Sequence, residues 1–131
     1  MNGMFSLIMI KPDALKRGLL DEIETRLSQK SLQIVKRTEL IMDRPSILRL
    51  WPGIFRQSTI ERSYSYLGGV PLPVWLIYGS DAVSQTLAVK SEMRRDFCDP
   101  EDKLHTLFHC PDTDEDFFRE YPILFSNEPL T

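Results

Sequence analysis

Residues 5–18, FSLIMIKPDALKRG, join a short apolar run to a basic turn, and this stretch decides how the fold begins. Its first six residues are almost continuously apolar, which is typical of a strand buried on both faces. Pro12 ends this strand, because its ring fixes φ and disfavours a helical conformation at the preceding residue. Lys11 is therefore predicted to stay extended at the end of the strand. A turn should start at Pro12 or Asp13 and close at Gly18.

Strands and helices alternate along the rest of the chain. Residues 19–30 carry apolar side chains on one helical face and polar side chains on the other, which predicts an amphipathic helix. The further predicted elements are a strand at 33–40, two short helices between 43 and 67 with Asp43 as N-cap and a break near Pro52 and Gly53, a strand at 73–78, a helix capped by Ser80 or Asp81 and reaching about Ser91, a strand at 103–109, and a helix after Asp112 or Thr113. This order favours an α+β or α/β sheet with helices packed against it.

The composition suits one small domain. The chain has 131 residues, of which 42% are hydrophobic, so we expect a single domain over residues 1–131 with one sizeable core. The net charge of −3 provides no overall basic field for binding nucleic acid, and a small anionic ligand would need a locally positive pocket. The apolar run at residues 1–10 begins without a basic segment and is too short for a signal peptide or membrane span. Cytoplasm is the expected compartment.

Two places in the sequence combine residues suited to phosphate chemistry. Residues 11–18 concentrate three cations just beyond a buried strand, where the loops of an open sheet usually present ligand sites. His109 stands at the end of a predicted strand, just before a helix N-terminus. Imidazole can act as a nucleophile near pH 7, and helix amides can stabilise the phosphoryl group that it would accept. A solvated basic turn and a histidine held in the core are the ordinary alternatives.

A zinc site is a weaker hypothesis. Cys98, His105, His109 and Cys110 supply the thiol and imidazole groups that zinc prefers. Their spacing counts against the hypothesis, because no close cysteine pair is present and the adjacent His109 and Cys110 would point to opposite faces of a strand. We therefore expect no protein metal site and two reduced thiols.

Four segments together resemble the nucleoside diphosphate kinases. Residues 5–23 resemble the family's opening strand, Lys-Pro-Asp turn, Arg-Gly-Leu segment and first helix; residues 71–83 resemble its middle strand and the helix after it. Residues 94–97, RRDF, resemble its Arg-Gly-Asp-Phe segment, and residues 109–125 resemble its active-site histidine and following helix. The resemblance implies an α+β fold of the ferredoxin-like βαββαβ type, with an antiparallel four-stranded sheet and helices packed on it.

The resemblance also implies a ping-pong phosphotransferase. The histidine takes a γ-phosphoryl group from a nucleoside triphosphate and passes it to a nucleoside diphosphate or related phosphorylated acceptor, with Mg²⁺ carried on the phosphates. By position, His109 is the phosphorylated nucleophile and Glu120 the carboxylate that orients its ring. Lys11 would contact the ribose hydroxyl and the phosphates, and Arg94 would bind phosphate.

The sequence departs from the family pattern where nucleotide is held. Leu87 stands in place of a second phosphate-binding arginine, and a long loop is largely missing between residues 91 and 94. Arg95, Lys90 and Trp51 are the candidates to compensate, since each lost charge-assisted contact costs about 1.5–3 kcal/mol. The same loop builds much of the subunit contact in hexameric relatives, so we expect a homo-oligomer that is a dimer or small assembly rather than a hexamer.

Further departures affect the predicted substrate contacts. Trp51 replaces a tyrosine near the phosphates, Thr59 stands at the position of the phenylalanine that stacks on the base, and Thr106 lies near the ribose-contacting asparagine. Pro111 replaces a serine that supports the histidine and glutamate. These changes leave open a second hypothesis, a catalytically silent kinase-like module that binds a nucleotide or a protein partner.

Overall fold

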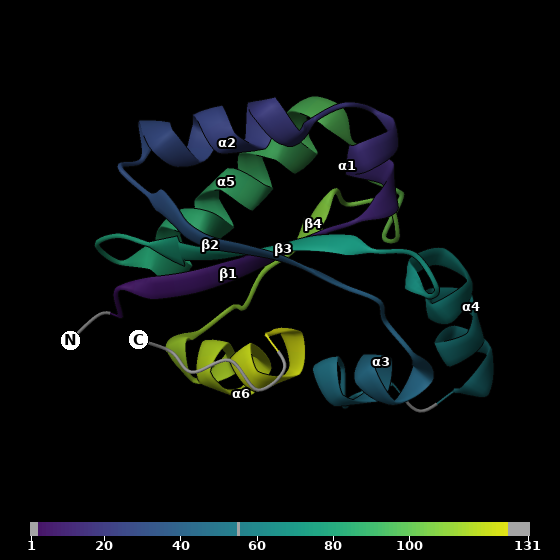
Figure 1. Cartoon of the computed structure of the whole chain (residues 1–131). Helices are drawn as coiled ribbons and strands as arrows, with labels where there is room; N and C mark the ends of the chain where they lie inside the picture. Colours follow the sequence, from purple (N-terminus) through teal and green to yellow (C-terminus); the bar gives the residue numbers. More distant parts are fainter. Residues whose placement is uncertain (1–2, 55, 126–131) are drawn as a thin grey trace.

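The computed structural model describes residues 3–54 and 56–125, so the two ends of the expected 1–131 domain, 1–2 and 126–131, lie outside the described residues (Figure 1). The described elements follow in the order β1 (Phe5–Ile10), α1 (Pro12–Lys16), α2 (Leu20–Gln29), β2 (Gln33–Leu40), α3 (Arg44–Leu50), α4 (Gln57–Leu67), β3 (Leu72–Tyr78), α5 (Ala82–Phe97), β4 (Phe108–His109) and α6 (Asp114–Leu124).

The four strands form one antiparallel sheet. Their spatial order is β2-β3-β1-β4, and each neighbouring pair runs antiparallel. β1 is central, since its Met9 lies opposite both Val74 of β3 and His109 of β4. This topology confirms the α+β ferredoxin-like fold with an antiparallel four-stranded sheet.

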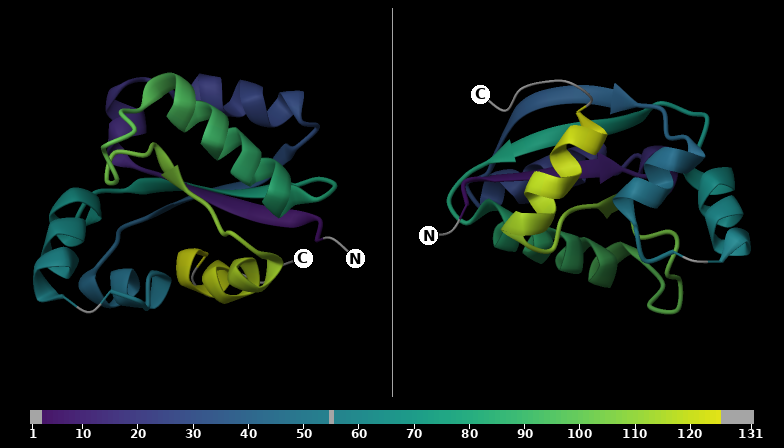
Figure 2. Two further views of the ribbon diagram at one scale, coloured as in Figure 1. Left: turned by 180° about the vertical axis from the view of Figure 1, so that it is seen from behind. Right: turned by 90° about the horizontal axis from the view of Figure 1, so that it is seen from below.

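Helices cover both faces of the sheet. In Figures 1 and 2, α2 and α5 lie on one face, while α3 and α6 lie on the other. Because side chains alternate along a strand, β1 contributes to two apolar clusters: Leu7 and Met9 belong to one, and Ile8 and Ile10 to the other. All four side chains are fully buried, which confirms the strand with two buried faces.

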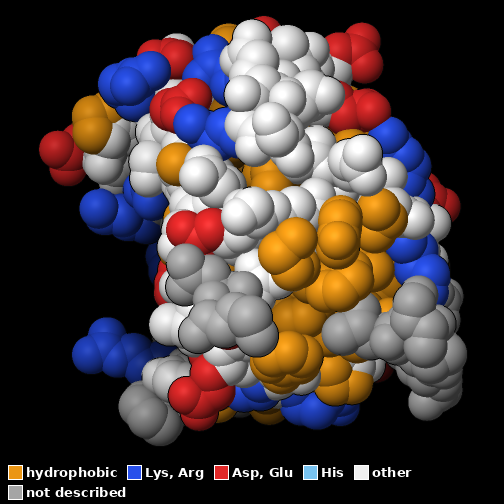
Figure 3. Space-filling model, turned by 90° about the vertical axis from the view of Figure 1, so that its left-hand side faces the viewer, with side chains coloured by type: hydrophobic (Ala, Val, Ile, Leu, Met, Phe, Trp, Pro, Cys, Tyr) orange, Lys and Arg blue, Asp and Glu red, His pale blue; other side chains and the backbone are white. Residues whose placement is uncertain are grey.

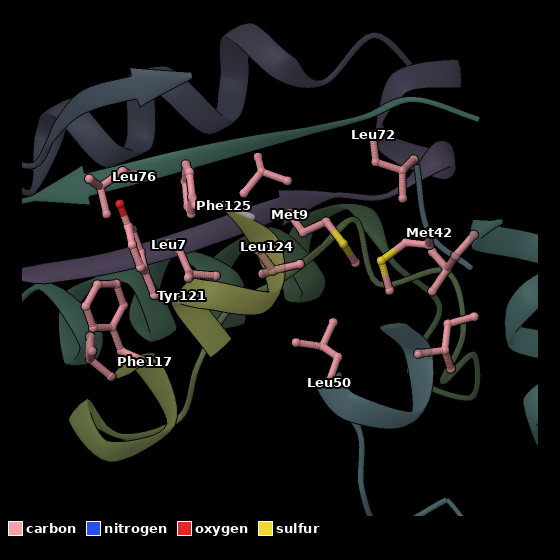
Figure 4. Packing of buried hydrophobic residues seen from close by; sticks show 14 residues of the cluster. Leu7, Met9, Met42, Leu50, Leu72, Leu76, Phe117, Tyr121, Leu124 and Phe125 are labelled. Atoms are coloured by element: carbon pink, nitrogen blue, oxygen red, sulfur yellow. The ribbon is translucent and has the colours of Figure 1, made fainter. Parts of the chain in front are cut away.

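α6 is held against β1 by its own apolar face. Figure 4 shows the side chains that meet there: Leu7, Met9, Phe117, Tyr121, Leu124 and Phe125. The predicted cap is confirmed at Thr113, whose hydroxyl accepts a hydrogen bond from the Asp116 amide at 3.0 Å. Burying one such leucine or phenylalanine contributes about 1.5–3 kcal/mol. The packing therefore fixes the helix that carries Glu120.

The predicted strand at 103–109 is wrong for most of its length, because β4 contains only Phe108 and His109. The Asp102 carboxylate accepts hydrogen bonds from the amides of Leu104 and His105, both at 2.9 Å. Such local bonds compete with a sheet ladder. The segment consequently turns, and Leu107 adopts a left-handed φ of 76° just before the short strand.

The predictions for α5 need two corrections. The helix continues past Ser91 to Phe97, because the first helix-breaking residue after it is Pro100 and because Val89 and Met93 are buried along it. Asp81 does stand at the N-cap, but its side chain makes no capping hydrogen bond. The break near Pro52 and Gly53 is confirmed, since α3 ends at Leu50 and α4 starts at Gln57.

Hydrophobic side chains also gather on the surface. Figure 3 shows them as one continuous area on the side of the molecule where both ends of the described chain lie in Figure 1. Tyr78 and Phe118 are among the exposed large hydrophobic residues, and their rings join through Phe5 and Phe117 in a series of aromatic contacts.

None of the helices in the described ranges is long and apolar enough to span a membrane.

Candidate active site

The pairing of β1 with β4 brings together the two predicted site residues that are far apart in sequence, Lys11 and His109. His109 lies opposite Met9, and the amide of Lys11 donates a hydrogen bond to the carbonyl of Leu107 at 2.9 Å. The lysine that follows the first strand and the histidine of the last strand therefore lie close together. Lys11 is extended, with φ −89° and ψ 159°, as its position before proline predicts.

His109 is oriented by a buried carboxylate. Its Nε2 lies 2.7 Å from Oε1 of Glu120, whose side chain is 4% exposed. A carboxylate has no proton to donate, so Nε2–H is the donor and the lone pair lies on Nδ1. Within the described part of the chain, Nδ1 makes no hydrogen bond. A positioned imidazole with a free Nδ1 lone pair is the arrangement a nucleophile needs.

Trp51 packs against the ring of His109, and Arg119 binds the residues around it. The Trp51 ring meets the imidazole edge to face, with 5.3 Å between ring centroids. Arg119 donates to the carbonyl oxygens of Arg49 and Leu50 and lies 3.3 Å from Oε2 of Glu120. These bonds join the end of α3 to α6, and they occupy the second oxygen of the carboxylate that orients the ring.

Lys11 projects into the same region. Its ammonium donates to Oγ1 of Thr106 at 2.9 Å and to the carbonyl of Leu104 at 3.3 Å. Burial, with a smaller contribution from the charges of Lys90 and Arg94, lowers the pKa of Lys11 to about 8, although the carboxylates of Asp13 and Asp102 oppose the change. A partly desolvated ammonium with only neutral partners gains most from a bound anion.

A cationic pocket of about 470 Å³ opens beside the histidine. Its described lining contains four cations and no carboxylate: Lys11, Trp51, Ile54, Ser63, Leu67, Lys90, Arg94, Lys103, Leu104, Thr106 and His109. Among the described residues, Lys90, Arg94 and Lys103 have no hydrogen-bonding or ion-pair partner for their side chains. In a chain with net charge −3, this concentration of unpaired positive charge favours a polyanion.

The structure brings most of the predicted site residues together. Lys11, Arg94, Thr106 and Trp51 line the cationic pocket with His109, and Glu120 lies behind the imidazole. Thr59 does not line this pocket; it lies in the first turn of α4. Ser63, four residues later on the same helix face, lines it instead. Ser63 was not predicted as a site residue, although helical periodicity from Thr59 indicates it.

A buried carboxylate supports the turn that carries Lys11. Asp13 accepts hydrogen bonds from the hydroxyl of Tyr66 and, at 3.0 Å, from the amide of Leu107. Burial raises the pKa of the Tyr66 hydroxyl, which keeps it protonated as a donor. The Lys-Pro-Asp turn is thereby bound to the segment just before His109. Sequence reasoning did not assign this role to Asp13.

No cluster of ligands supports the zinc hypothesis in the described ranges. No group of three or more histidine, cysteine, aspartate or glutamate residues there could hold a metal ion. Burial raises the pKa of the Cys110 thiol to about 12 and raises that of Cys98 as well, so both thiols keep their protons.

Comparison with known proteins shows which family the chain belongs to. The profile of the family described as nucleoside diphosphate kinase matches residues 5–130. A nucleoside diphosphate kinase of Sulfurisphaera tokodaii is 30% identical over 95% of this chain and 90% of its own length, and one of Ignicoccus hospitalis is 29% identical over 94% and 89%. The fold is shared with the crystal structure of the enzyme from Encephalitozoon cuniculi, with a TM-score of 0.80, 20% identity, and coverage of 98% and 95%. This chain belongs to the nucleoside diphosphate kinase family.

Proposed function

We propose that this protein transfers the γ-phosphoryl group of a nucleoside triphosphate to a nucleoside diphosphate through a phosphohistidine at His109. The observation that carries the proposal is the pairing of an oriented imidazole with a cationic pocket: Nε2 is held by Glu120 at 2.7 Å, and four cations without a carboxylate line the space beside the ring. Phosphoryl transfer depends mainly on this combination of positioning and charge neutralisation.

In the first half-reaction, Nδ1 of His109 attacks the γ-phosphorus. The N–P bond forms while the bond from the γ-phosphorus to the bridging oxygen breaks, and the nucleoside diphosphate leaves with that electron pair. The proton on Nε2 stays in place, because the Glu120 carboxylate stabilises the positive charge that develops on the ring. No separate base is required.

In the second half-reaction, a terminal oxygen of the acceptor diphosphate attacks the phosphorus. The N–P bond breaks, its electron pair returns to Nδ1, and a new triphosphate leaves. Lys11 and Arg94 would bind phosphate oxygens in both directions, and Mg²⁺ would enter with the nucleotide rather than on protein ligands. The lining of the pocket by both cations supports these roles.

The remaining contacts are assigned to the nucleoside. Thr106 would position Lys11 and meet the ribose, because its hydroxyl already accepts from the Lys11 ammonium. Trp51 would offer a flat apolar surface next to His109, and Thr59, in the first turn of α4, stays a predicted base contact. We further propose a homo-oligomer smaller than a hexamer and a cytoplasmic location; the exposed aromatic surface around Tyr78 and Phe118 is consistent with subunit contact.

Labelling with Mg²⁺ and ATP carrying labelled γ-phosphate tests the proposal. We expect an acid-labile, base-stable phosphoprotein whose label passes to an added nucleoside diphosphate. His109→Ala should abolish the label, whereas His105→Ala, which changes an exposed ring bonded to Asp102, should keep it. Absence of label from every nucleoside triphosphate would refute the proposal. Thermal stabilisation by nucleotide without label would instead favour the silent binding module, which the family comparison does not support.

A further inference from the structure

Lys90 lies where three pockets meet. It lines the cationic pocket beside Lys11, a neighbouring pocket of about 410 Å³ that reaches Glu120, and a third pocket of about 550 Å³ along α5. The first two pockets share only Trp51, Ile54, Lys90 and His109 as described lining residues. Lys90 and the imidazole therefore border the same junction from different elements, α5 and β4.

The charge of Lys90 acts on both sides of this junction. It lowers the pKa of Lys11 in the cationic pocket, and it opposes the effect of burial on the pKa of Cys110, the residue after His109. Lys90 is half-buried, between the buried Val89 on its own helix and the pocket space. In the described part of the chain, no carboxylate pairs with its ammonium. Asp112 lines the second and third pockets together with Lys90, and Asp116 and Glu120 line the second, but none of these three carboxylates forms an ion pair with its ammonium. A half-buried cation without a direct ion pair is left for a ligand to neutralise.

We propose that Lys90 binds the phosphoryl group during its transfer between the nucleotide and His109. The inference rests on the proposed function and adds a catalytic residue to it. Leu87, one helical turn earlier on α5, carries no charge. Lys90, on the next turn, therefore supplies the positive charge on this side of the helix. Arg95 cannot do so, because it is exposed, bonded to Asp96 at 2.9 Å, and lines only the third pocket.

The position predicts distinct effects for two substitutions. Lys90→Met removes the charge and keeps much of the side-chain length, so phosphorylation of His109 should slow about 10–100-fold, the size expected from one lost hydrogen bond to a charged group. Lys90→Arg keeps the charge and should retain most of the rate. Lys90→Met should also move the alkaline limb of the pH profile upward, because the neighbouring charge no longer lowers the pKa of Lys11. A structural role alone would not produce that movement.

Single-turnover phosphorylation with Mg²⁺ and ATP, in parallel with equilibrium titration of Mg²⁺ and ADP, decides the question. Lys16→Met is the matched control, since Lys16 is exposed on α1 and lines neither pocket that contains His109. We expect its rate and affinity to equal those of the wild type, and the melting temperature of Lys90→Met to be no lower than that of the wild type. A Lys90→Met protein that is labelled within about twofold of the wild-type rate would overturn the inference.

Failure of the proposed function gives a different pattern. If the wild type takes no label, the proposed transfer fails, and the ADP titration still tests Lys90 as a phosphate-binding residue. Binding about tenfold weaker in Lys90→Met than in Lys16→Met would then support the phosphate contact. Equal binding in the two variants would overturn it.

Discussion

We expect the pH dependence of nucleotide use to follow from Lys11, the proposed phosphate-binding cation. Its pKa is lowered to about 8, first by burial, which removes water from the charged form, and then by Lys90 and Arg94; Asp13 and Asp102 oppose the change. The charged form is therefore the main form below pH 8 and is lost as pH rises through that value. With a pKa near 8, about nine-tenths of the free protein carries the charge at pH 7 and about one-tenth at pH 9.

We expect kcat/KM for the nucleoside triphosphate to be level near pH 7 and to fall about tenfold for each pH unit above 8, because kcat/KM reports titration of the free enzyme. Folding responds with the opposite sign. Between the folded value of about 8 and the ordinary value of 10.5, the unfolded chain binds more protons than the folded protein, so stability rises with pH. A melting temperature that does not fall over this range would show that the lost activity is not due to unfolding.

Steady-state assays from pH 6.5 to 10 on three proteins measure this effect. Lys11→Arg should be less active than the wild type, but its kcat/KM should not fall above pH 8, because a guanidinium stays charged throughout. Lys16→Arg, at an exposed position on the same turn, should keep the wild-type profile. The reasoning is refuted if the wild type holds a constant kcat/KM to pH 10, or if Lys11→Arg shows the same limb.

Three more substitutions test the support around the site. Glu120→Gln replaces the charged acceptor of His109 Nε2 by a neutral one, so the single-turnover phosphorylation rate should fall about tenfold, and an unchanged rate would contradict the assigned role. Tyr66→Phe removes the donor to buried Asp13 and should lower the free energy of unfolding by about 1–3 kcal/mol in a urea titration; no measurable loss would show that water replaces the hydroxyl. Leu7→Ala leaves a cavity at a fully buried position and should cost about 2–5 kcal/mol, whereas a cost below 1 kcal/mol would mean that the core collapses around it.

The sequence predicted correctly the helices and strands whose limits are set by neighbouring residues. The apolar run that ends at Pro12 became β1 over the predicted residues, and Asp43 caps α3 by accepting from the Ser46 amide at 2.8 Å. The strand predicted at 103–109 failed because the carboxylate of Asp102 bonds to the amides that a ladder would need. Periodicity in a sequence does not reveal such a competing acceptor.

The site was less accessible to sequence reasoning than the fold. His109 and Glu120 are 11 residues apart, and their 2.7 Å contact depends on how α6 packs on the sheet, so only the family resemblance paired them. Lys103 carries no local signal, because only the folded chain brings it to the pocket that it shares with His109. That a cation lacks a partner is likewise a property of the folded arrangement and cannot be read from charge patterning.

The two-residue strand β4 has a consequence for how activity arises during synthesis. Only two residue pairs join it to β1, Met9 with His109 and Ile10 with Phe108. Lys11 is made before β2, β3 and their helices, whereas His109 emerges only after them and Glu120 follows later still. Closure of this long-range contact is entropically costly and comes late. A nascent or C-terminally shortened chain can hold most of the sheet and yet lack the histidine and carboxylate of the proposed active site.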